Sequence, residues 1–133
     1  MIMNEGGEHT FDLEERTFEF AKRTLNMTKQ LPRSDTNLYY SNQVIRSSSS
    51  MGANYREAND CLGDKDFLFR LRIVRKEAKE SIYWLRLIIE NNSQLKVRMQ
   101  PLLQESIELN KIFSSIIKKK EKIKEKSGKD RNN

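Results

Sequence analysis

Basic residues recur at a fixed spacing in the third quarter of the chain. Lys65, Arg72, Lys79 and Arg86 are seven residues apart. At about 100° per residue, a helix places these four within roughly 60° of one another. Arginine, with its planar guanidinium, suits phosphate in particular. The spacing therefore predicts one helix face that binds a polyanion, against the alternative of a solvated surface. The predicted stripe, with its flanking residues, comprises Lys65, Arg72, Arg75, Lys76, Lys79 and Arg86.

The acidic residues of the same segment fall on another arc. Asp66, Glu77 and Glu80 lie at about 80 to 140° from Arg72 on the helical wheel. Glu77 and Glu80 are three residues apart and have Lys76 and Lys79 as neighbours. This pattern is typical of a solvated ladder of salt bridges rather than of a general acid and base. We accordingly expect no enzymatic site there.

A second basic region lies at the end of the chain. Residues 118–126 read KKKEKIKEK, and the candidate nucleic-acid-binding residues there are Lys118, Lys119, Lys120 and Lys122. The formal net charge is +6; residues 61–100 carry nine basic against five acidic residues, and residues 118–133 carry eight against three. A surplus confined to two segments favours anionic partners, although it can also serve solubility alone.

Several kinds of chemistry are not expected from the composition. His9 is the single histidine and Cys61 the single cysteine, so one chain offers no Cys/His metal cluster, no Cys–His pair and no disulfide. No Gly-rich phosphate loop is present, and we expect neither a cofactor nor a metal. The chain has no apolar run of about 18 residues and no secretory signal pattern, which predicts a cytoplasmic protein with no membrane partner.

The elements that position these residues are predicted to be four amphipathic helices. The first begins at Asp12 and buries Phe18, Ala21 and Leu25, with Leu13 as a further candidate. Pro32 ends it, and Ser34 or Asp35 caps the second. The third runs from about Lys65 to Asn91, and the fourth from Lys96 or Pro101 to about residue 117. The prediction is an all-α, antiparallel up-down-up-down four-helix bundle over residues 11–117, with a disordered leader at 1–10 and a basic, fraying tail at 118–133.

The apolar faces are read from helical spacing. The second helix is expected to bury Leu38, Ile45, Tyr55 and Leu62, with Val44, Met51 and Ala58 beside them; the third Phe67, Leu71, Val74, Ala78, Ser81, Ile82, Leu85 and Ile89; the fourth Leu102, Leu103, Ile107, Leu109, Phe113, Ile116 and Ile117. Ile73, Tyr83, Trp84 and Leu87 fall outside these faces, from which we infer self-association.

The middle of the second helix contains small residues. Residues 47–53 read SSSSMGA, a composition that could also form a linker. Helical phase nevertheless continues through the segment. We therefore predict a close crossing, where small side chains let a neighbouring helix approach.

Two segments resemble a known family. Residues 45–59 (IRSSSSMGANYREAN) and 75–85 (RKEAKESIYWL), together with the opening FDLEERT at 11–17, closely resemble the signature segments of bacterial four-helix-bundle proteins. These proteins were first noticed as reading frames in intervening sequences of 23S ribosomal RNA genes. The resemblance covers roughly residues 11 to 117.

The resemblance implies an architecture and a set of partners. Members resemble the accessory protein of diversity-generating retroelements, a five-membered ring with a basic surface that binds nucleic acid and a reverse transcriptase. It therefore implies a homo-oligomer, a pentamer, whose candidate partners are RNA or DNA and a reverse transcriptase or another protein. It supplies no catalytic residues. Signature positions, with packing and assembly as their implied roles, are Arg46, Gly52, Asn54, Tyr55, Glu57, Tyr83 and Trp84.

Two functional hypotheses follow. The leading one is a non-enzymatic bundle that binds nucleic-acid backbone through its basic face. The rival is an adaptor that docks a protein partner and whose basic residues only keep it in solution.

Overall fold

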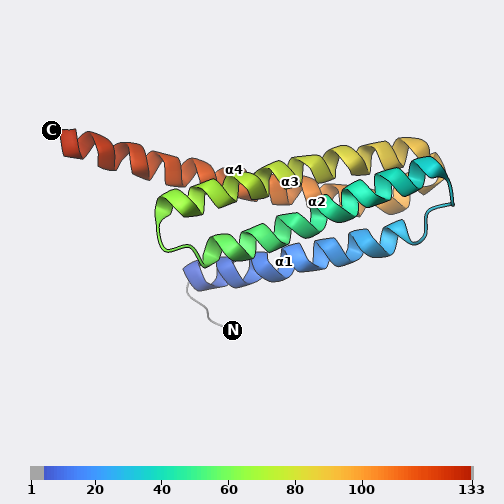
Figure 1. Cartoon of the computed structure of the whole chain (residues 1–133), viewed down its shortest axis with the longest axis horizontal. Coiled ribbons are helices and arrows are strands. Elements are labelled where there is room, and N and C mark those ends of the chain that lie inside the picture. Colours follow the sequence, from blue (N-terminus) through green and yellow to red (C-terminus); the bar gives the residue numbers. More distant parts are fainter. Residues whose placement is uncertain (1–4, 133) are drawn as a thin grey trace.

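The chain folds into four long helices. The computed structural model describes the backbone of residues 5–132 and the side chains of residues 13–128. The helices are α1 (Glu5–Thr28), α2 (Asp35–Asn59), α3 (Asp64–Asn91) and α4 (Lys96–Asn132), with a short 3₁₀ turn, η1 (Ser93–Leu95), before α4. α1 and α3 run in one direction and α2 and α4 in the other (Figure 1). The predicted all-α, up-and-down arrangement is confirmed.

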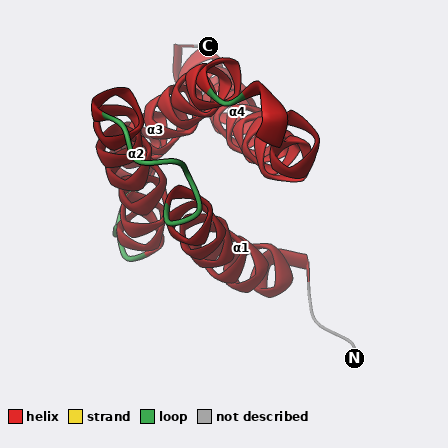
Figure 2. Cartoon of the chain, turned by 90° about the vertical axis from the view of Figure 1, so that its right-hand side faces the viewer, coloured by secondary structure: helices red, strands yellow, loops and turns green. Residues whose placement is uncertain are grey.

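The core lies between the helices in their sequence order. Viewed along the bundle, α1, α2, α3 and α4 follow one another around it (Figure 2). Contact is most extensive between α2 and α3, and least extensive, among the four neighbouring pairs, between α1 and α4. α2 and α3 are thus the centre of the fold. Its large, fully buried side chains include Phe20, Val44, Met51, Leu71, Val74, Leu85, Ile88, Leu109, Phe113 and Ile117.

The buried face of α1 differs from the predicted one. Phe18 is 60% exposed and Leu25 40% exposed, whereas Leu13, Phe20 and two threonines are buried. The Thr17 hydroxyl donates to the carbonyl of Leu13, and that of Thr24 donates to the carbonyl of Phe20, each at 2.8 Å. Because each hydroxyl is satisfied within its own helix, threonine can enter the core at little cost. Leu13 was predicted correctly, but Phe18, Ala21 and Leu25 form a second face.

α2 is continuous, so the linker alternative is wrong and the close crossing is confirmed. The hydroxyls of Ser47 and Ser81 share a 2.8 Å hydrogen bond between α2 and α3. A Cβ atom on Gly52 would lie 3.1 Å from Oγ1 of Thr17 on α1, a tighter contact than a side chain normally makes. Small residues therefore admit α3 on one side of α2 and α1 on the other.

The exposed residues of α2 and its loop correct another part of the prediction. Leu38 is 63% exposed and Leu62 is fully exposed. Tyr55 is buried as predicted, together with Val44, Met51 and Ala58, and Ile45 is half-buried. The prediction placed Leu38, Ile45 and Leu62 at the middle of the buried face. The middle is in fact occupied by the residues that were predicted to lie beside them.

An amide pair closes one end of the bundle. Asn37 Nδ2 donates to Asn92 Oδ1 at 3.0 Å, and Asn92 Nδ2 donates back to Asn37 Oδ1 at 2.8 Å. Asn37 also donates to the carbonyl of Pro32, and Asn92 to that of Ile88. Both side chains are buried, so these bonds supply the partners that burial removes. The pair joins the start of α2 to the end of α3.

Helix ends show where local signals were sufficient. Ser34 caps α2, as one of the two predicted candidates, by accepting a 3.0 Å bond from the backbone N–H of Asn37. α1 begins at Glu5 rather than at Asp12. The side chain of Asp12 and residues 1–4 of the predicted leader lie outside the described part of the chain. α4 begins at Lys96, with Pro101 inside it, and continues through the tail that was predicted to fray. Lysine and glutamate are good helix formers, and α3 supplies contacts to the first part of the tail.

Candidate nucleic-acid interface

The predicted basic stripe lies on the outer surface of α3. Lys65, Arg72, Lys76, Lys79 and Arg86 are exposed, and Arg75 is half-buried. From Lys65 to Arg86 the helix rises about 32 Å at about 1.5 Å per residue. Within the described part of the chain, no carboxylate lies at ion-pair distance from any stripe residue except Arg72. Most of the stripe's charge is therefore not neutralised by neighbouring side chains.

Arg72 departs from the expectation that the stripe is separate from carboxylates. Its Nη2 lies 3.0 Å from Oε2 of Glu121 on α4, and both side chains are about half exposed. The helical wheel of α3 separates the acids of that helix, but it contains no information about an acid from another helix. Arg72 is thus the partly neutralised member of the stripe.

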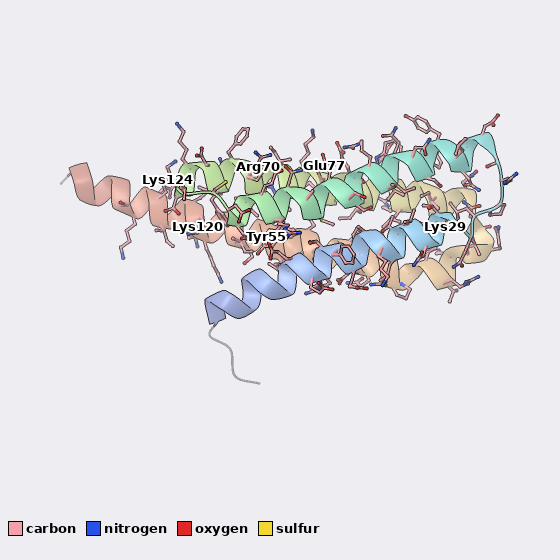
Figure 3. All side chains as sticks on the ribbon, turned by 60° about the horizontal axis from the view of Figure 1, so that its bottom comes forward. Lys29, Tyr55, Arg70, Glu77, Lys120 and Lys124 are labelled. Atoms are coloured by element: carbon pink, nitrogen blue, oxygen red, sulfur yellow. The ribbon has the colours of Figure 1, made fainter. Side chains whose placement is uncertain are left out.

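The basic tail adjoins the first half of α3. Lys120 Nζ lies 3.4 Å from Oδ1 of Asp64 and 5.4 Å from the centre of the Phe67 ring. Lys120 and Lys124 lie on the last part of α4, which extends beyond the turn between α2 and α3 (Figures 1 and 3). The structure therefore places the two basic regions side by side. The other candidates in the tail, Lys118, Lys119 and Lys122, are exposed.

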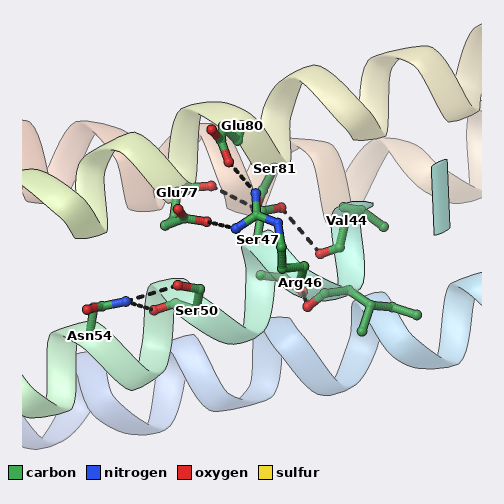
Figure 4. A network of polar contacts seen from close by, with 10 residues as sticks. Val44, Arg46, Ser47, Ser50, Asn54, Glu77, Glu80 and Ser81 are labelled. Carbon is green, nitrogen blue, oxygen red and sulfur yellow. Dashed lines mark hydrogen bonds and ion pairs between the residues drawn. The ribbon is translucent and has the colours of Figure 1, made fainter. Parts of the chain in front are cut away.

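The acids of α3 do not form the predicted solvated ladder. Glu77 is buried, with only 4% of its surface exposed, and Arg46 of α2 binds both acids. Arg46 Nη1 lies 3.1 Å from Glu77 Oε2, and Nη2 lies 2.5 Å from Glu80 Oε2 (Figure 4). The hydrogen bond to Glu80, together with the charge of Glu77, raises the pKa of Arg46 above its ordinary value, although burial opposes this. The acids thus pair with Arg46 rather than with Lys76 or Lys79, and neither lysine has an ion-pair partner among the described residues.

The other signature residues also make packing contacts. Asn54 donates to the backbone carbonyl and to the hydroxyl of Ser50, and it accepts a 2.9 Å bond from Arg70 of α3. Arg70 in turn pairs with Glu57 at 3.2 Å. The buried Tyr55 ring lies 5.2 Å from the ring of Phe113 on α4. Together with the Gly52 crossing, these contacts make the first signature segment a joint between α2 and its neighbours.

A comparison with known families matches most of the chain, including both signature segments. The family model described as "23S rRNA-intervening sequence protein" matches residues 10–115. The chain belongs to this family. The match nearly coincides with the bundle predicted over residues 11–117 and includes both signature segments.

A solved structure is similar to this family member. It is the 1.70 Å crystal structure of a protein of unknown function from the S23 ribosomal protein family of Bacteroides thetaiotaomicron. The two chains share 37% sequence identity with a TM-score of 0.73, over 80% of this chain and 98% of the other. No curated protein matches the chain.

In this family member, the second signature segment contributes to an aromatic cluster. The Trp84 ring lies 5.1 Å from Tyr83 beside it on α3, and 5.9 and 6.0 Å from Tyr39 and Tyr40 of α2. Trp84 is half-buried, whereas Tyr39 and Tyr83 are more than half exposed. Trp84 was predicted to lie outside the core faces. Its ring is instead partly covered by tyrosines of its own chain, so it does not require a second chain to cover it.

Sequence reasoning missed a second exposed ring on the basic face. Phe69 is 63% exposed, one helical turn from Lys65 and from Arg72. The seven-residue spacing could have revealed it, since Phe69 and Tyr83 lie at about 60° and 20° on the wheel centred on Arg72. The outer surface of α3 is therefore both basic and aromatic.

A second outward surface, formed by α1 and α2, carries exposed apolar side chains. Phe18 and Leu25 of α1 and Leu38 of α2 are each at least 40% exposed. Phe18 and Ala21 line a groove with the small residues Ser49, Gly52 and Ala53, and Leu25, Leu38 and Ile45 line a second groove further along. Charged residues border both grooves: Glu14, Glu15 and Arg56 the first, and Lys29, Arg33 and Asp35 the second. We call this surface the α1–α2 apolar face. No helix in the described part of the chain is long and apolar enough to cross a membrane.

Proposed function

We propose that this chain is a non-enzymatic, self-associating bundle that binds the backbone of RNA or DNA through the outer face of α3 and the adjoining tail of α4. The observation that carries the proposal is the set of stripe residues without a carboxylate partner among the described residues: Lys65, Arg75, Lys76, Lys79 and Arg86. The exposed lysines 118, 119 and 122 extend this set. Such a surface contacts phosphates by charge and shape rather than by reading base edges.

The proposal predicts a particular dependence on salt. Each phosphate that a basic side chain neutralises releases condensed counterions, so log affinity falls linearly with log salt concentration, with a slope of about −0.7 to −0.9 per contact. Several stripe and tail residues acting together give a steep slope. Binding at low salt should disappear at high salt.

Charge reversal on the stripe tests the proposal. The triple variant Arg72→Glu, Arg75→Glu, Lys79→Glu should lose at least about 100-fold in affinity for RNA and duplex DNA, because three phosphate contacts become repulsive. The matched control reverses Lys22, Arg23 and Arg98, which are exposed on α1 and α4, away from the stripe and outside both grooves of the α1–α2 apolar face. Circular dichroism checks that both variants remain helical. Unchanged binding in the stripe variant would contradict the assignment of this face.

We propose further that the chain associates through the α1–α2 apolar face, as a pentamer if it follows the resemblance to the retroelement accessory protein. Exposed side chains of Phe18, Leu25 and Leu38 support this, because large apolar groups left exposed together on one side of a protein are typical of an interface. Size-exclusion chromatography with light scattering measures the oligomer directly. Phe18→Glu combined with Leu38→Glu should dissociate it, whereas Val97→Glu, at an exposed apolar residue outside the face, should not.

The same face supports the alternative function of a protein-docking adaptor, for which the resemblance suggests a reverse transcriptase. In that case the wild-type chain binds neither RNA nor duplex DNA at low salt. A pull-down after nuclease treatment should then recover one protein, and Phe18→Glu with Leu38→Glu should prevent the recovery. An oligomer that binds nucleic acid and needs no second protein would count against the adaptor.

A further inference from the structure

The exposed residues on the outer surface of α3 follow one regular series. Successive members are three or four positions apart, so that they form a single stripe along the helix. Five members are cationic and two are aromatic rings, with Phe69 63% exposed and Tyr83 57% exposed. The series consists of Lys65, Phe69, Arg72, Lys76, Lys79, Tyr83 and Arg86.

Each ring lies between cations of adjacent helical turns. Lys65 and Arg72 flank Phe69, and residues three or four apart on a helix have Cβ atoms about 5–6 Å apart. Lys79 and Arg86 flank Tyr83 in the same manner. The two rings are about 21 Å apart along the axis at about 1.5 Å per residue. A strand lying along α3 would thus meet two sites where a ring and a pair of cations occur together.

The Tyr83 ring is positioned by its neighbours. It packs edge-on against Trp84, with an interplanar angle of 78°, and Trp84 packs edge-on against Tyr39 at 82°. Edge-to-face packing is a favourable arrangement for aromatic pairs. Tyr83 is nevertheless more than half exposed, so part of its ring surface remains available to a ligand.

We propose that the ligand of this surface is single-stranded nucleic acid, with unpaired bases stacking on Phe69 and Tyr83 while the flanking cations contact its phosphates. This inference rests on the proposed nucleic-acid binding and specifies its substrate class. In a duplex the bases are already stacked on one another, so exposed rings would add little to phosphate contacts. Unpaired bases stack on aromatic side chains without regard to sequence, which makes rings interleaved with cations typical of single-strand binding.

The experiment compares strand types and ring variants at one salt concentration. Fluorescence anisotropy measures binding of a labelled 20-nucleotide oligo(dT) and of a 20-base-pair duplex. The variant Phe69→Leu, Tyr83→Leu keeps every charge but removes both rings, and Phe69→Trp, Tyr83→Phe is its matched control. Base–aromatic stacking predicts that the leucine variant loses at least about tenfold in affinity for oligo(dT). Duplex affinity and the salt slope should change little, and the control should bind as the wild type does.

Trp84 provides an independent readout. It is the single tryptophan of the chain and contacts Tyr83, so a base stacked at Tyr83 should alter its fluorescence. We expect oligo(dT) to quench this fluorescence and the duplex to leave it nearly unchanged. These measurements use the wild-type chain, so they do not depend on whether a variant folds.

The outcomes separate this inference from the proposed function. Two results would overturn the single-strand inference alone. One is a leucine variant that binds oligo(dT) with the same affinity as the wild type. The other is a wild-type chain that binds the duplex as tightly as oligo(dT) and shows no change in Trp84 fluorescence with either. A wild-type chain that binds neither nucleic acid at low salt overturns both. A preference for oligo(dT) that the leucine variant loses supports both.

Discussion

The outer surface of α3 and the α1–α2 apolar face belong to the same bundle but have opposite chemistry. The first carries a series of cations and two rings, and the second carries exposed aliphatic and aromatic side chains around small residues. Arg46 of α2 binds Glu77 and Glu80 of α3, so these acids do not pair with the outward cation Lys76. On α1, threonines occupy part of the core face while Phe18 and Leu25 point outward. The chemistry of each surface thus depends on polar contacts made next to it: the Arg46 ion pairs beside the α3 surface, and the threonine hydrogen bonds inside α1.

Breaking the α1–α2 contact should have the largest effect. In Gly52→Leu the new side chain meets Thr17, whose Oγ1 would be 3.1 Å from its Cβ and whose backbone carbonyl carbon would be 3.6 Å away. Overpacking of this kind should lower the free energy of unfolding by about 3 kcal/mol. Thermal unfolding followed by circular dichroism measures the loss. The apolar face should be disrupted along with the crossing, whereas the outer surface of α3 lies on a different helix.

The control for this prediction is Gly128→Leu. A Cβ at Gly128 would have no atom within 4 Å, so this variant should be at least as stable as the wild type. Equal melting temperatures for Gly52→Leu and Gly128→Leu would show that the crossing is not tight.

Removing Arg46 should weaken the separation of charges on α3. Arg46→Ala leaves the buried Glu77 carboxylate without its partner, which should cost about 2 kcal/mol of stability. Glu80, freed of Arg46, lies four residues after Lys76 and can pair with it, so nucleic-acid affinity should also fall a few-fold. Denaturant unfolding and anisotropy measure the two effects.

Two further variants identify the cause. Arg56→Ala removes an exposed arginine of the same helix that has no ion pair with a described residue, and it should change neither property appreciably. Adding Glu77→Gln to Arg46→Ala should restore part of the stability, because a neutral amide is less costly to bury than an unpaired carboxylate. If the double variant is no more stable than Arg46→Ala, the buried charge is not the cause.

The smallest expected effect comes from removing the carboxylate that partly neutralises the stripe. Glu121→Gln removes the ion-pair partner of Arg72, so affinity for nucleic acid should rise about two- to threefold and the salt slope should steepen by about 0.7 to 0.9. Glu125→Gln is the matched control, since it removes the same charge from an exposed residue of the tail that pairs with no described residue. An equal effect of both variants would indicate that only net charge matters.

The buried residues were predictable where the sequence of one helix is enough to identify its core face. The core positions Leu71, Val74 and Leu85 of α3 follow from spacing because their helix packs on both sides, and the crossing at Gly52 follows from small residues in phase. The face of α1 was not predictable from apolar residues alone. Thr17 and Thr24 enter the core through hydrogen bonds to their own helix, which a count of apolar residues does not register.

The candidate site was predicted in its positions but not in its partners. Spacing correctly placed Lys65, Lys76 and Lys79 on the outward face of α3. The pairs Arg46–Glu77 and Arg72–Glu121 join residues of different helices, and a helical wheel cannot show which helix lies opposite an acid. The contacts of Lys120 and Glu121 with α3 likewise join different helices and could not be read from the tail alone.

The modest contact between α1 and α4 has a consequence for the order in which the bundle opens. α1 packs mainly on α2, whereas α2 and α3 are held by the most extensive contact of the fold. Regions with fewer buried contacts open at lower free energy than the global unfolding transition. Backbone amides of α1 should therefore exchange with deuterium before those in the middle of α2 and α3. The α1–α2 apolar face would then form and dissolve as a local unit, independently of the surface on α3.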